Sequence, residues 1–264
     1  MELFNKILVP YDFSDCAKNA LKEALKLCDK HCGEITLMHV LNVMTTPGDL
    51  KEAEEQMQRE LHEVSLIENI DGGVIVKKGV PAEEIANTIN EEDYSLCIMG
   101  TNKRHGIISE LVGTNALKIL QNVKAPIIVI PGDKHLRGIH RIALATDFKK
   151  LKSNDILTYI RDIARGFNSE LHLVNVSEHP EQYSHEEAIE ALDLHNFFED
   201  VNHGFFFIKE KDPVDGISKY VKEKNIDLLA LIPRKHTFFN SIFNDSVSEK
   251  IALKLSVPLF SLHE

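Results

Sequence analysis

A polar stretch of the chain has a glycine near each end, and the spacing of these two glycines could hold a phosphate group. The stretch reads MGTNKRHGIISELVGT from residue 99, with Gly100 just after an apolar run and Gly113 and Thr114 at its end. Glycine lets a ligand approach the backbone closely. A helix that opens at Gly113, Thr114 and Asn115 offers free N–H groups and the positive end of its dipole, which both favour anions. The alternative is that the glycines only turn the chain and that Thr114 only caps a helix.

A carboxylate near the start of the chain is a second candidate for ligand binding. Asp12 directly follows the apolar run ILVPY. A carboxylate at a strand end can accept a hydrogen bond from a ribose hydroxyl or from an adenine amino group. Asp12 could equally cap the following helix together with Ser14, so the sequence leaves both roles open.

Short apolar runs alternate with segments of helical period in each half of the chain. This alternation is typical of βαβ units around a parallel sheet. In the first half the pattern predicts strands at 5–11, 34–42, 73–78, 95–100 and 126–131, and helices at 15–30, 49–68, 81–91 and 113–123. The ligand crevice of such a sheet opens beyond the carboxyl ends of its strands, where the strand order reverses. Asp12 and Gly100 both stand at the ends of predicted strands, so we expect them at this edge.

The chain repeats itself in its second half. The segment KILVPYDFS from Lys6 matches RIALATDFK from Arg141, and three further segments recur in the same order. Four matches in one order indicate a duplication, with a boundary in residues 132–139. We therefore predict two tandem five-stranded parallel α/β domains of Rossmann-like fold, 1–135 and 136–264. Their last strands, APIIVIP and SVPLFSLH, are apolar at a sheet edge, so we expect the two domains to form an internal pseudo-dimer.

Charge and composition narrow the classes of partner. The chain has 41 acidic and 30 basic residues and a net charge of −11, which disfavours nucleic acid and anionic membranes as partners. No apolar run is long enough to span a membrane and no secretion signal begins the chain, so we expect a cytoplasmic protein. Four cysteines are too few for a disulfide scaffold. A metal ion could be bound by Cys28, His31 and Cys32, but these residues lack a fourth ligand, and we predict no metal site.

These features resemble the universal stress protein family. The resemblance rests on a first strand that ends in an aspartate, on a Gly-x-x-Gly-x9-Gly-Ser/Thr signature and on a proline in the last strand, and it spans both halves. It implies five-stranded α/β domains and, where the signature is present, a site for ATP, with adenine near the first two strands and the phosphates in the glycine loop. The resemblance assigns Pro10, Asp12 and Val40 to the adenine and ribose. It assigns to the ribose and phosphates Met99, Gly100, Lys103, Gly113, Thr114 and Asn115.

Lys103 is the departure from the family pattern, because it stands where the family has its second glycine. Its side chain could block the close approach that glycine permits, or its ammonium could neutralise phosphate charge. A third reading is a solvated turn that includes Arg104. Because Asp12 and the other signature residues are retained, we predict an altered but working ATP site, with or without Mg²⁺, in the first half.

The second half has lost the residues of this signature. By the repeat, Gly100 corresponds to Ile232 and Gly113 to Asp245, while Phe238 would crowd the loop. An aspartate at a helix N-terminus repels a phosphate. We predict a degenerate copy with a structural role. Its basic cluster at 234–236 could serve an unknown protein partner.

The sequence therefore predicts an ATP-binding regulatory protein of the stress response, whose nucleotide state a partner protein reads. The alternative is a scaffold that binds partners and no nucleotide, with both sites degenerate. An enzyme of the wider nucleotide-binding α/β group is a third hypothesis, but the chain has no Gly-x-Ser-x-Gly elbow and no Walker loop. We expect at most slow ATP hydrolysis, and we expect His39 to be packed beside the adenine. The chain could also form a homodimer.

Overall fold

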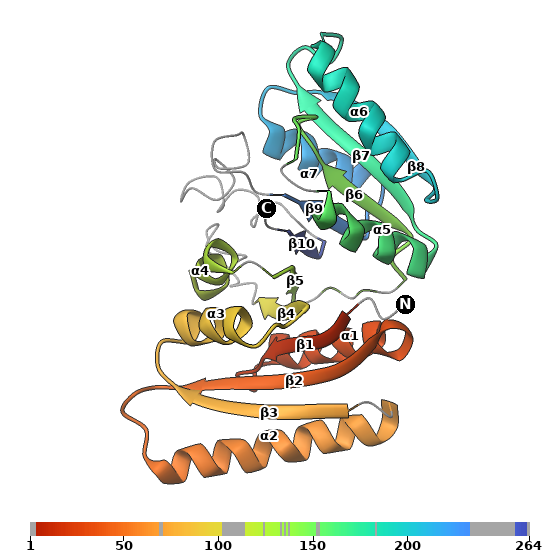
Figure 1. Cartoon of the computed structure of the whole chain (residues 1–264). Helices are drawn as coiled ribbons and strands as arrows, with labels where there is room; N and C mark the ends of the chain where they lie inside the picture. Colours follow the sequence, from red (N-terminus) through yellow and green to blue (C-terminus); the bar gives the residue numbers. More distant parts are fainter. Residues whose placement is uncertain are drawn as a thin grey trace. The chain divides into compact units, whose positions relative to one another are not determined.

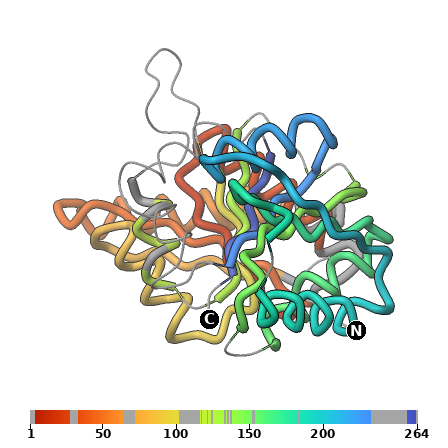
Figure 2. The backbone as a smooth tube through the Cα atoms, turned by 90° about the horizontal axis from the view of Figure 1, so that it is seen from above, coloured from red at the N-terminus to blue at the C-terminus, as the bar shows by residue number. Residues whose placement is uncertain are grey.

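The computed structural model describes residues 4–68, 71–101, 114–123, 125–132, 134, 136, 138–151, 154–182, 184–232 and 257–262 of the chain. The chain divides into two compact units, Met1–His135 and Leu136–Glu264, called unit 1 and unit 2 below. Figure 1 labels their elements, and Figure 2 follows the backbone through them from the N-terminus to the C-terminus. No helix among the described residues combines the length and the apolar character needed to cross a membrane.

Unit 1 is a five-stranded parallel sheet whose successive strands are connected by helices (Figure 1). The strands are β1 (Phe4–Pro10), β2 (Cys32–Leu41), β3 (Asp71–Lys78), β4 (Leu96–Thr101) and β5 (Ile127–Pro131). The helices are α1 (Asp15–His31), α2 (Pro47–Glu68), α3 (Pro81–Glu91) and α4 (Thr114–Asn122). The strand order is β3-β2-β1-β4-β5. Because the order reverses between β1 and β4, a ligand crevice is expected beyond the carboxyl ends of these two strands.

Unit 2 repeats this topology. Its strands are β6 (Arg141–Ala145), β7 (Glu170–Ser177), β8 (His203–Lys209), β9 (Leu228–Leu231) and β10 (Leu259–Ser261), and its helices are α5 (Asp155–Phe167), α6 (His185–Phe197) and α7 (Pro213–Glu223). The order β10-β9-β6-β7-β8 matches unit 1 strand for strand, with β6 in the place of β1. Two tandem parallel α/β folds are therefore confirmed. Their arrangement as a pseudo-dimer stays a prediction.

The first helix illustrates how the sequence positions the candidate site. The Ser14 hydroxyl accepts a hydrogen bond from the backbone N–H of Ala17 at 3.3 Å and so caps α1. The apolar side chains at steps of three and four along the helix are all buried: Ala17, Ala20, Leu21, Ala24, Leu25 and Leu27. α1 contacts β1, β2 and β4. Burial of this face holds the start of α1 against the carboxyl ends of the strands.

The observed elements of unit 1 begin and end within two residues of the predicted ones. One difference has a clear cause. α2 begins at Pro47, two residues before the predicted start, because Thr46 and Asp49 form a cap. The Asp49 carboxylate accepts a hydrogen bond from the backbone N–H of Thr46 at 2.6 Å, and the N–H of Asp49 donates to the Thr46 hydroxyl at 3.4 Å. Pro47 suits the first helical position, where its missing N–H costs nothing.

Candidate functional site

A pocket of unit 1 lies beyond the carboxyl ends of β1, β2 and β4, where the reversal of strand order predicts a crevice. Its cavity volume is about 180 Å³. Five of the nine residues expected from the sequence line this one pocket, although they come from separate parts of the chain: Pro10, Asp12, Val40, Met99 and Gly100. Helices α3 and α4 complete the wall with Pro81, Ile85, Ala116 and Ile119.

The other four expected residues belong to the phosphate side of the site. Lys103 and Gly113 lie outside the described residues. Thr114 and Asn115 are the first two residues of α4, and the structure describes their backbone. Because Ala116 belongs to the pocket wall, the N-terminus of α4 lies next to the pocket. The first backbone N–H groups of a helix have no partner within it, and such groups favour an anion.

Asp12 forms a turn at the entrance of α1. Its Oδ1 accepts a hydrogen bond from the backbone N–H of Ser14 at 3.1 Å and another from the Ser14 hydroxyl. Its Oδ2 has no hydrogen-bond partner among the residues that the structure describes. Asp12 is exposed and lines the pocket. One carboxylate oxygen thus serves the turn while the other meets no protein donor, so the two roles that the sequence left open are compatible.

The turn after Asp12 recurs in unit 2. Asp147 Oδ1 accepts a hydrogen bond from the backbone N–H of Lys149 at 3.2 Å, as Asp12 does from the residue two positions on. The phenylalanine that follows each aspartate is left-handed, with φ of 64° at Phe13 and 49° at Phe148. Bulky residues adopt this conformation rarely and at an energetic cost. Both units therefore hold a bulky residue in a costly conformation at this edge of the sheet.

His39 ties the turn to the second strand. Its Nδ1 lies 2.6 Å from the backbone carbonyl oxygen of Tyr11, and its ring contacts Phe13 with centroids 5.0 Å apart. A carbonyl oxygen only accepts hydrogen bonds, so Nδ1 carries the proton, and in the neutral ring Nε2 is an acceptor. No donor among the described residues reaches Nε2. Because His39 lines the pocket, this acceptor belongs to the site as well as to the packing that the sequence predicts.

Tyr11 anchors the same turn from the side of α2. Its hydroxyl donates a hydrogen bond to the Glu60 carboxylate. Burial, followed by this hydrogen bond and the charge of Glu60, raises the pKa of Tyr11 above its usual range. The phenol therefore stays neutral, and the turn is held between α2 and β2.

Gly100 is a point of very close approach between β4 and α1. A Cβ atom at this position would lie 2.1 Å from the carbonyl oxygen of Cys16 and 3.1 Å from the backbone nitrogen of Ala17. No side chain tolerates such a distance to backbone atoms, so any other residue here requires α1 to move. The sequence predicts that this glycine makes room for a ligand. In the structure Gly100 lines the pocket and also makes room for the start of α1, so the role in ligand binding stays a prediction.

The wall of the pocket is largely apolar. Among the described residues that line it, Asp12 is the one charged side chain. The helices and one neighbouring strand position contribute wall residues that the sequence did not indicate: Cys16, Ala17, Met38, Pro81, Ile85, Ala116 and Ile119. The available signal was positional, because most of these residues fall in the first turns of helices that follow the predicted strands.

Unit 2 has different residues at the positions equivalent to the pocket of unit 1. Ile232, in the place of Gly100, is buried and lines a small cavity with Leu151 and Leu157. Residues 146–154 connect β6 to α5, whereas the shorter segment 11–14 connects β1 to α1. A later start of the helix is consistent with the room that the isoleucine side chain needs. The counterparts of the rest of the signature lie outside the described residues.

Comparison with known sequences adds a family to these observations. The sequence model of the universal stress protein family matches the chain twice, over residues 3–131 and 138–261. Universal stress protein MJ0531 of Methanocaldococcus jannaschii is 27% identical over 144 residues, which are 50% of this chain and 85% of the relative. Universal stress protein YxiE of Bacillus subtilis is 24% identical over 147 residues, which are 48% of this chain and 99% of the relative.

Solved structures share the fold across both units. A crystal structure of a universal stress protein from Archaeoglobus fulgidus is similar with a TM-score of 0.76 and 21% identity, and the match covers 98% of this chain and 96% of that chain. The functionally unknown protein PA1789 from Pseudomonas aeruginosa has a TM-score of 0.67 at 14% identity, with 98% and 92% of the two chains covered. At these identities the likeness concerns the fold.

Proposed function

Because the chain belongs to the universal stress protein family, with one family domain in each half, we propose that it is an ATP-binding regulatory protein whose nucleotide site is the pocket of unit 1. Family membership alone does not decide this, since Lys103 interrupts the signature that typically accompanies ATP binding. The observation that carries the proposal is the convergence on one pocket of residues that the resemblance assigns to the nucleotide: Pro10, Asp12, Val40, Met99 and Gly100.

The wall of the pocket suits adenine and ribose. Val40, Ile85 and Met99 offer apolar surface to a flat ring from two strands and one helix. His39 Nε2 could accept a hydrogen bond from the adenine amino group, and Asp12 Oδ2 could accept one from a ribose hydroxyl. Both atoms meet no donor within the described part of the chain. A ligand rich in donors would therefore satisfy two acceptors of the wall.

We assign the phosphates to the start of α4, where the first N–H groups of the helix favour an anion. Lys103 belongs to the segment between β4 and α4, and its ammonium would neutralise part of the charge. Bound ATP, with or without Mg²⁺, would supply the negative charge of its triphosphate. The described wall holds no second carboxylate beside Asp12 that could act as a base or hold a metal ion, so we expect slow hydrolysis at most.

One observation favours the second candidate function, a scaffold that binds partners and no nucleotide. The contact with Cys16 is sufficient to explain why position 100 is a glycine. Its retention is then no evidence of a ligand, and Lys103 would indicate a decayed site. Binding has to be measured directly to separate the two functions.

The test uses freshly purified full-length protein. The protein is denatured and the supernatant is assayed for adenine nucleotide, and the melting temperature of nucleotide-free protein is measured with added ATP. A ligand that binds the folded state raises the melting temperature, so nucleotide in the supernatant or a shift with ATP supports the proposal. Tripolyphosphate is the control, because it carries the charge without the base. Absence of both signals, or an equal shift with tripolyphosphate, favours the scaffold.

A further inference from the structure

Unit 2 contains a pocket of its own at the carboxyl ends of β6 and β7. Its cavity volume is about 330 Å³, compared with about 180 Å³ for the pocket of unit 1. Since β6 and β7 correspond to β1 and β2, the two pockets occupy equivalent places in the two units. The signature glycines are absent from the second half, so the chemistry of this wall differs from that of a triphosphate site.

Asn175 supplies an unsatisfied acceptor in this wall. Its Nδ2 donates a hydrogen bond to the carbonyl oxygen of Thr146 at 3.0 Å, as the His39 ring does to Tyr11 in unit 1. Because a carbonyl oxygen only accepts, this bond fixes the orientation of the amide and leaves Oδ1 as the remaining polar atom. Asn175 is 9% exposed, and no donor among the described residues reaches Oδ1. Oδ1 is not among the fully buried unpaired atoms of the described residues, so it can accept a hydrogen bond from a ligand in the pocket.

The charges of the wall point to a cation. Three carboxylates line the pocket, those of Asp147, Glu178 and Glu187, against one ammonium, that of Lys149. Glu187 also accepts the hydrogen bonds that cap α6. His179 is the one other titratable side chain in the described wall. The excess of negative charge repels phosphate groups and attracts positive ones.

The other side of the pocket is aliphatic. Val174 and Val176 come from β7, and Ile217 comes from α7. These side chains offer apolar surface and no hydrogen-bonding group. A ligand that fits both sides combines a hydrocarbon body with at least one positively charged donor.

We propose that the unit 2 pocket binds a small aliphatic amine. The methylene groups of the ligand lie on Val174, Val176 and Ile217. An ammonium, which has three donors and no acceptor, donates to Asn175 Oδ1 and to the carboxylate of Asp147. This site uses neither the glycine signature nor the pocket of unit 1, so amine binding does not depend on whether unit 1 binds ATP.

Calorimetric titration of the full chain with putrescine at low salt tests the proposal. Putrescine should give a saturable isotherm with one site per chain. Two probes are matched to it: 1,4-butanediol has the same carbon chain without charge, and inorganic phosphate has the opposite charge. Neither should bind. Absence of putrescine binding, or equal binding of butanediol, would overturn the proposal.

Three variants locate the binding. Asp147→Asn keeps an oxygen for the N–H of Lys149 but removes the charge, and it should weaken putrescine by about tenfold. Glu178→Gln removes an exposed charge and should weaken putrescine binding by about twofold. Glu223→Gln is the control, since Glu223 is exposed at the end of α7 and is not part of the wall, and putrescine affinity should be unchanged. Unchanged affinity in Asp147→Asn with an intact circular dichroism spectrum contradicts the site.

Discussion

The carbonyl oxygen of Cys16 occupies the space that a side chain at Gly100 would fill, only 2.1 Å from where a Cβ atom would lie. The start of α1 and the end of β4 therefore touch at the base of the unit 1 pocket. This contact goes together with the short connection 11–14, which starts α1 soon after β1. In unit 2 the longer connection 146–154 accompanies Ile232. A glycine that resembles a ligand-binding feature is thus also a packing feature, and other positions have to test nucleotide binding.

Gly100→Ala should destabilise the fold. Its methyl group would meet backbone atoms of Cys16, so α1 must shift, and overpacking of this kind costs roughly 1–3 kcal/mol of the free energy of unfolding. Urea unfolding measures the change. Gly48→Ala is the matched control, because a Cβ there meets only the Thr46 hydroxyl at 3.6 Å, an ordinary contact. Equal stability of Gly100→Ala and the unmodified chain would show that α1 can shift without lowering the free energy of unfolding.

Lys103 is predicted to contribute to phosphate binding. If its ammonium pairs with a phosphate, Lys103→Ala should weaken the binding free energy of ATP by roughly 1–3 kcal/mol. Raised salt should narrow the difference, because salt screens the interaction. Calorimetry at two salt concentrations measures both effects, with Lys51→Ala as a control on the exposed side of α2. Tighter binding by Lys103→Ala would show instead that the side chain obstructs the site.

The pairing of the two units as an internal pseudo-dimer is tested by expressing residues 1–135 alone. β5 is an apolar strand at the end of the strand order of unit 1, and an uncovered strand of this kind favours association. The fragment should therefore be a dimer or insoluble. Analytical ultracentrifugation decides the point, and a stable monomer would count against the pairing.

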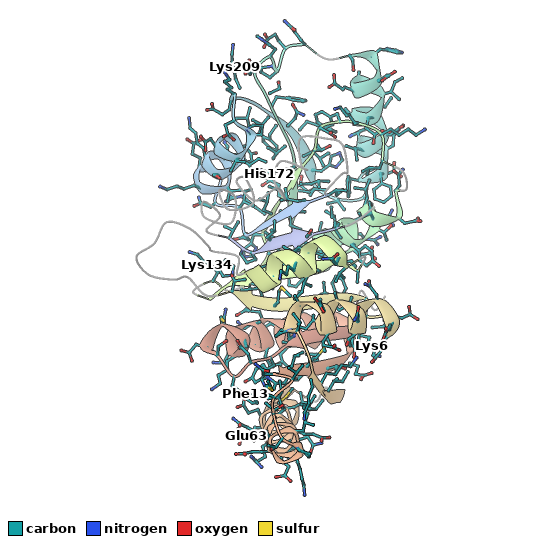
Figure 3. All side chains as sticks on the ribbon, turned by 90° about the vertical axis from the view of Figure 1, so that its left-hand side faces the viewer. Lys6, Phe13, Glu63, Lys134, His172 and Lys209 are labelled. Carbon is teal, nitrogen blue, oxygen red and sulfur yellow. The ribbon has the colours of Figure 1, made fainter. Side chains whose placement is uncertain are left out.

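His172 should make the stability of the chain depend on pH. Its side chain lies inside unit 2 (Figure 3). The ring stacks on Phe206 with centroids 4.4 Å apart, and its Nδ1 lies 2.8 Å from the Tyr220 hydroxyl. Burial is the largest effect and lowers the pKa of His172, whereas a hydrogen bond to Glu170 and the charge of Glu170 oppose this shift. The positive charges of Arg141 and Lys224 lower it further. The unfolded chain therefore takes up a proton at higher pH than the folded chain, so stability falls as the pH drops below about 6.5.

His172→Gln is expected to flatten this dependence. The variant should be less stable overall, because it loses the stacked ring, but its free energy of unfolding should change less between about pH 7.5 and 5.5. Urea unfolding at the two pH values provides the comparison, with His179→Gln as the control at an exposed site. A slope in His172→Gln equal to that of the unmodified chain would assign the pH dependence to other groups.

The fold of unit 1 could be predicted from the sequence because its signals are local. Apolar period, proline at a helix start and the Asp12–Ser14 turn locate the elements to within two residues. The wall from Cys16, Ile85 and Ile119 could not be predicted, since these residues belong to helices whose faces meet only in the folded unit.

Two further features depend on the register of parallel strands. β1 and β2 pair with Pro10 opposite Met38, which brings His39 to the carbonyl of Tyr11. The sequence predicts that His39 is packed, but no local pattern indicates this hydrogen bond or the acceptor that it leaves. The same holds for Asn175 in unit 2, whose hydrogen bond to Thr146 depends on the pairing of β6 with β7.

We predict that one chain binds one ATP, in unit 1. Gly113→Asp imports the residue that unit 2 carries at the equivalent position, and a carboxylate at the N-terminus of α4 would repel the phosphates. Aspartate caps helices well, so the fold should survive. Calorimetric titration of the full chain with ATP should give one site, which disappears in Gly113→Asp while the circular dichroism spectrum is unchanged. Two equivalent sites on the unmodified chain, or undiminished affinity in a folded Gly113→Asp variant, would contradict the assignment of ATP to unit 1.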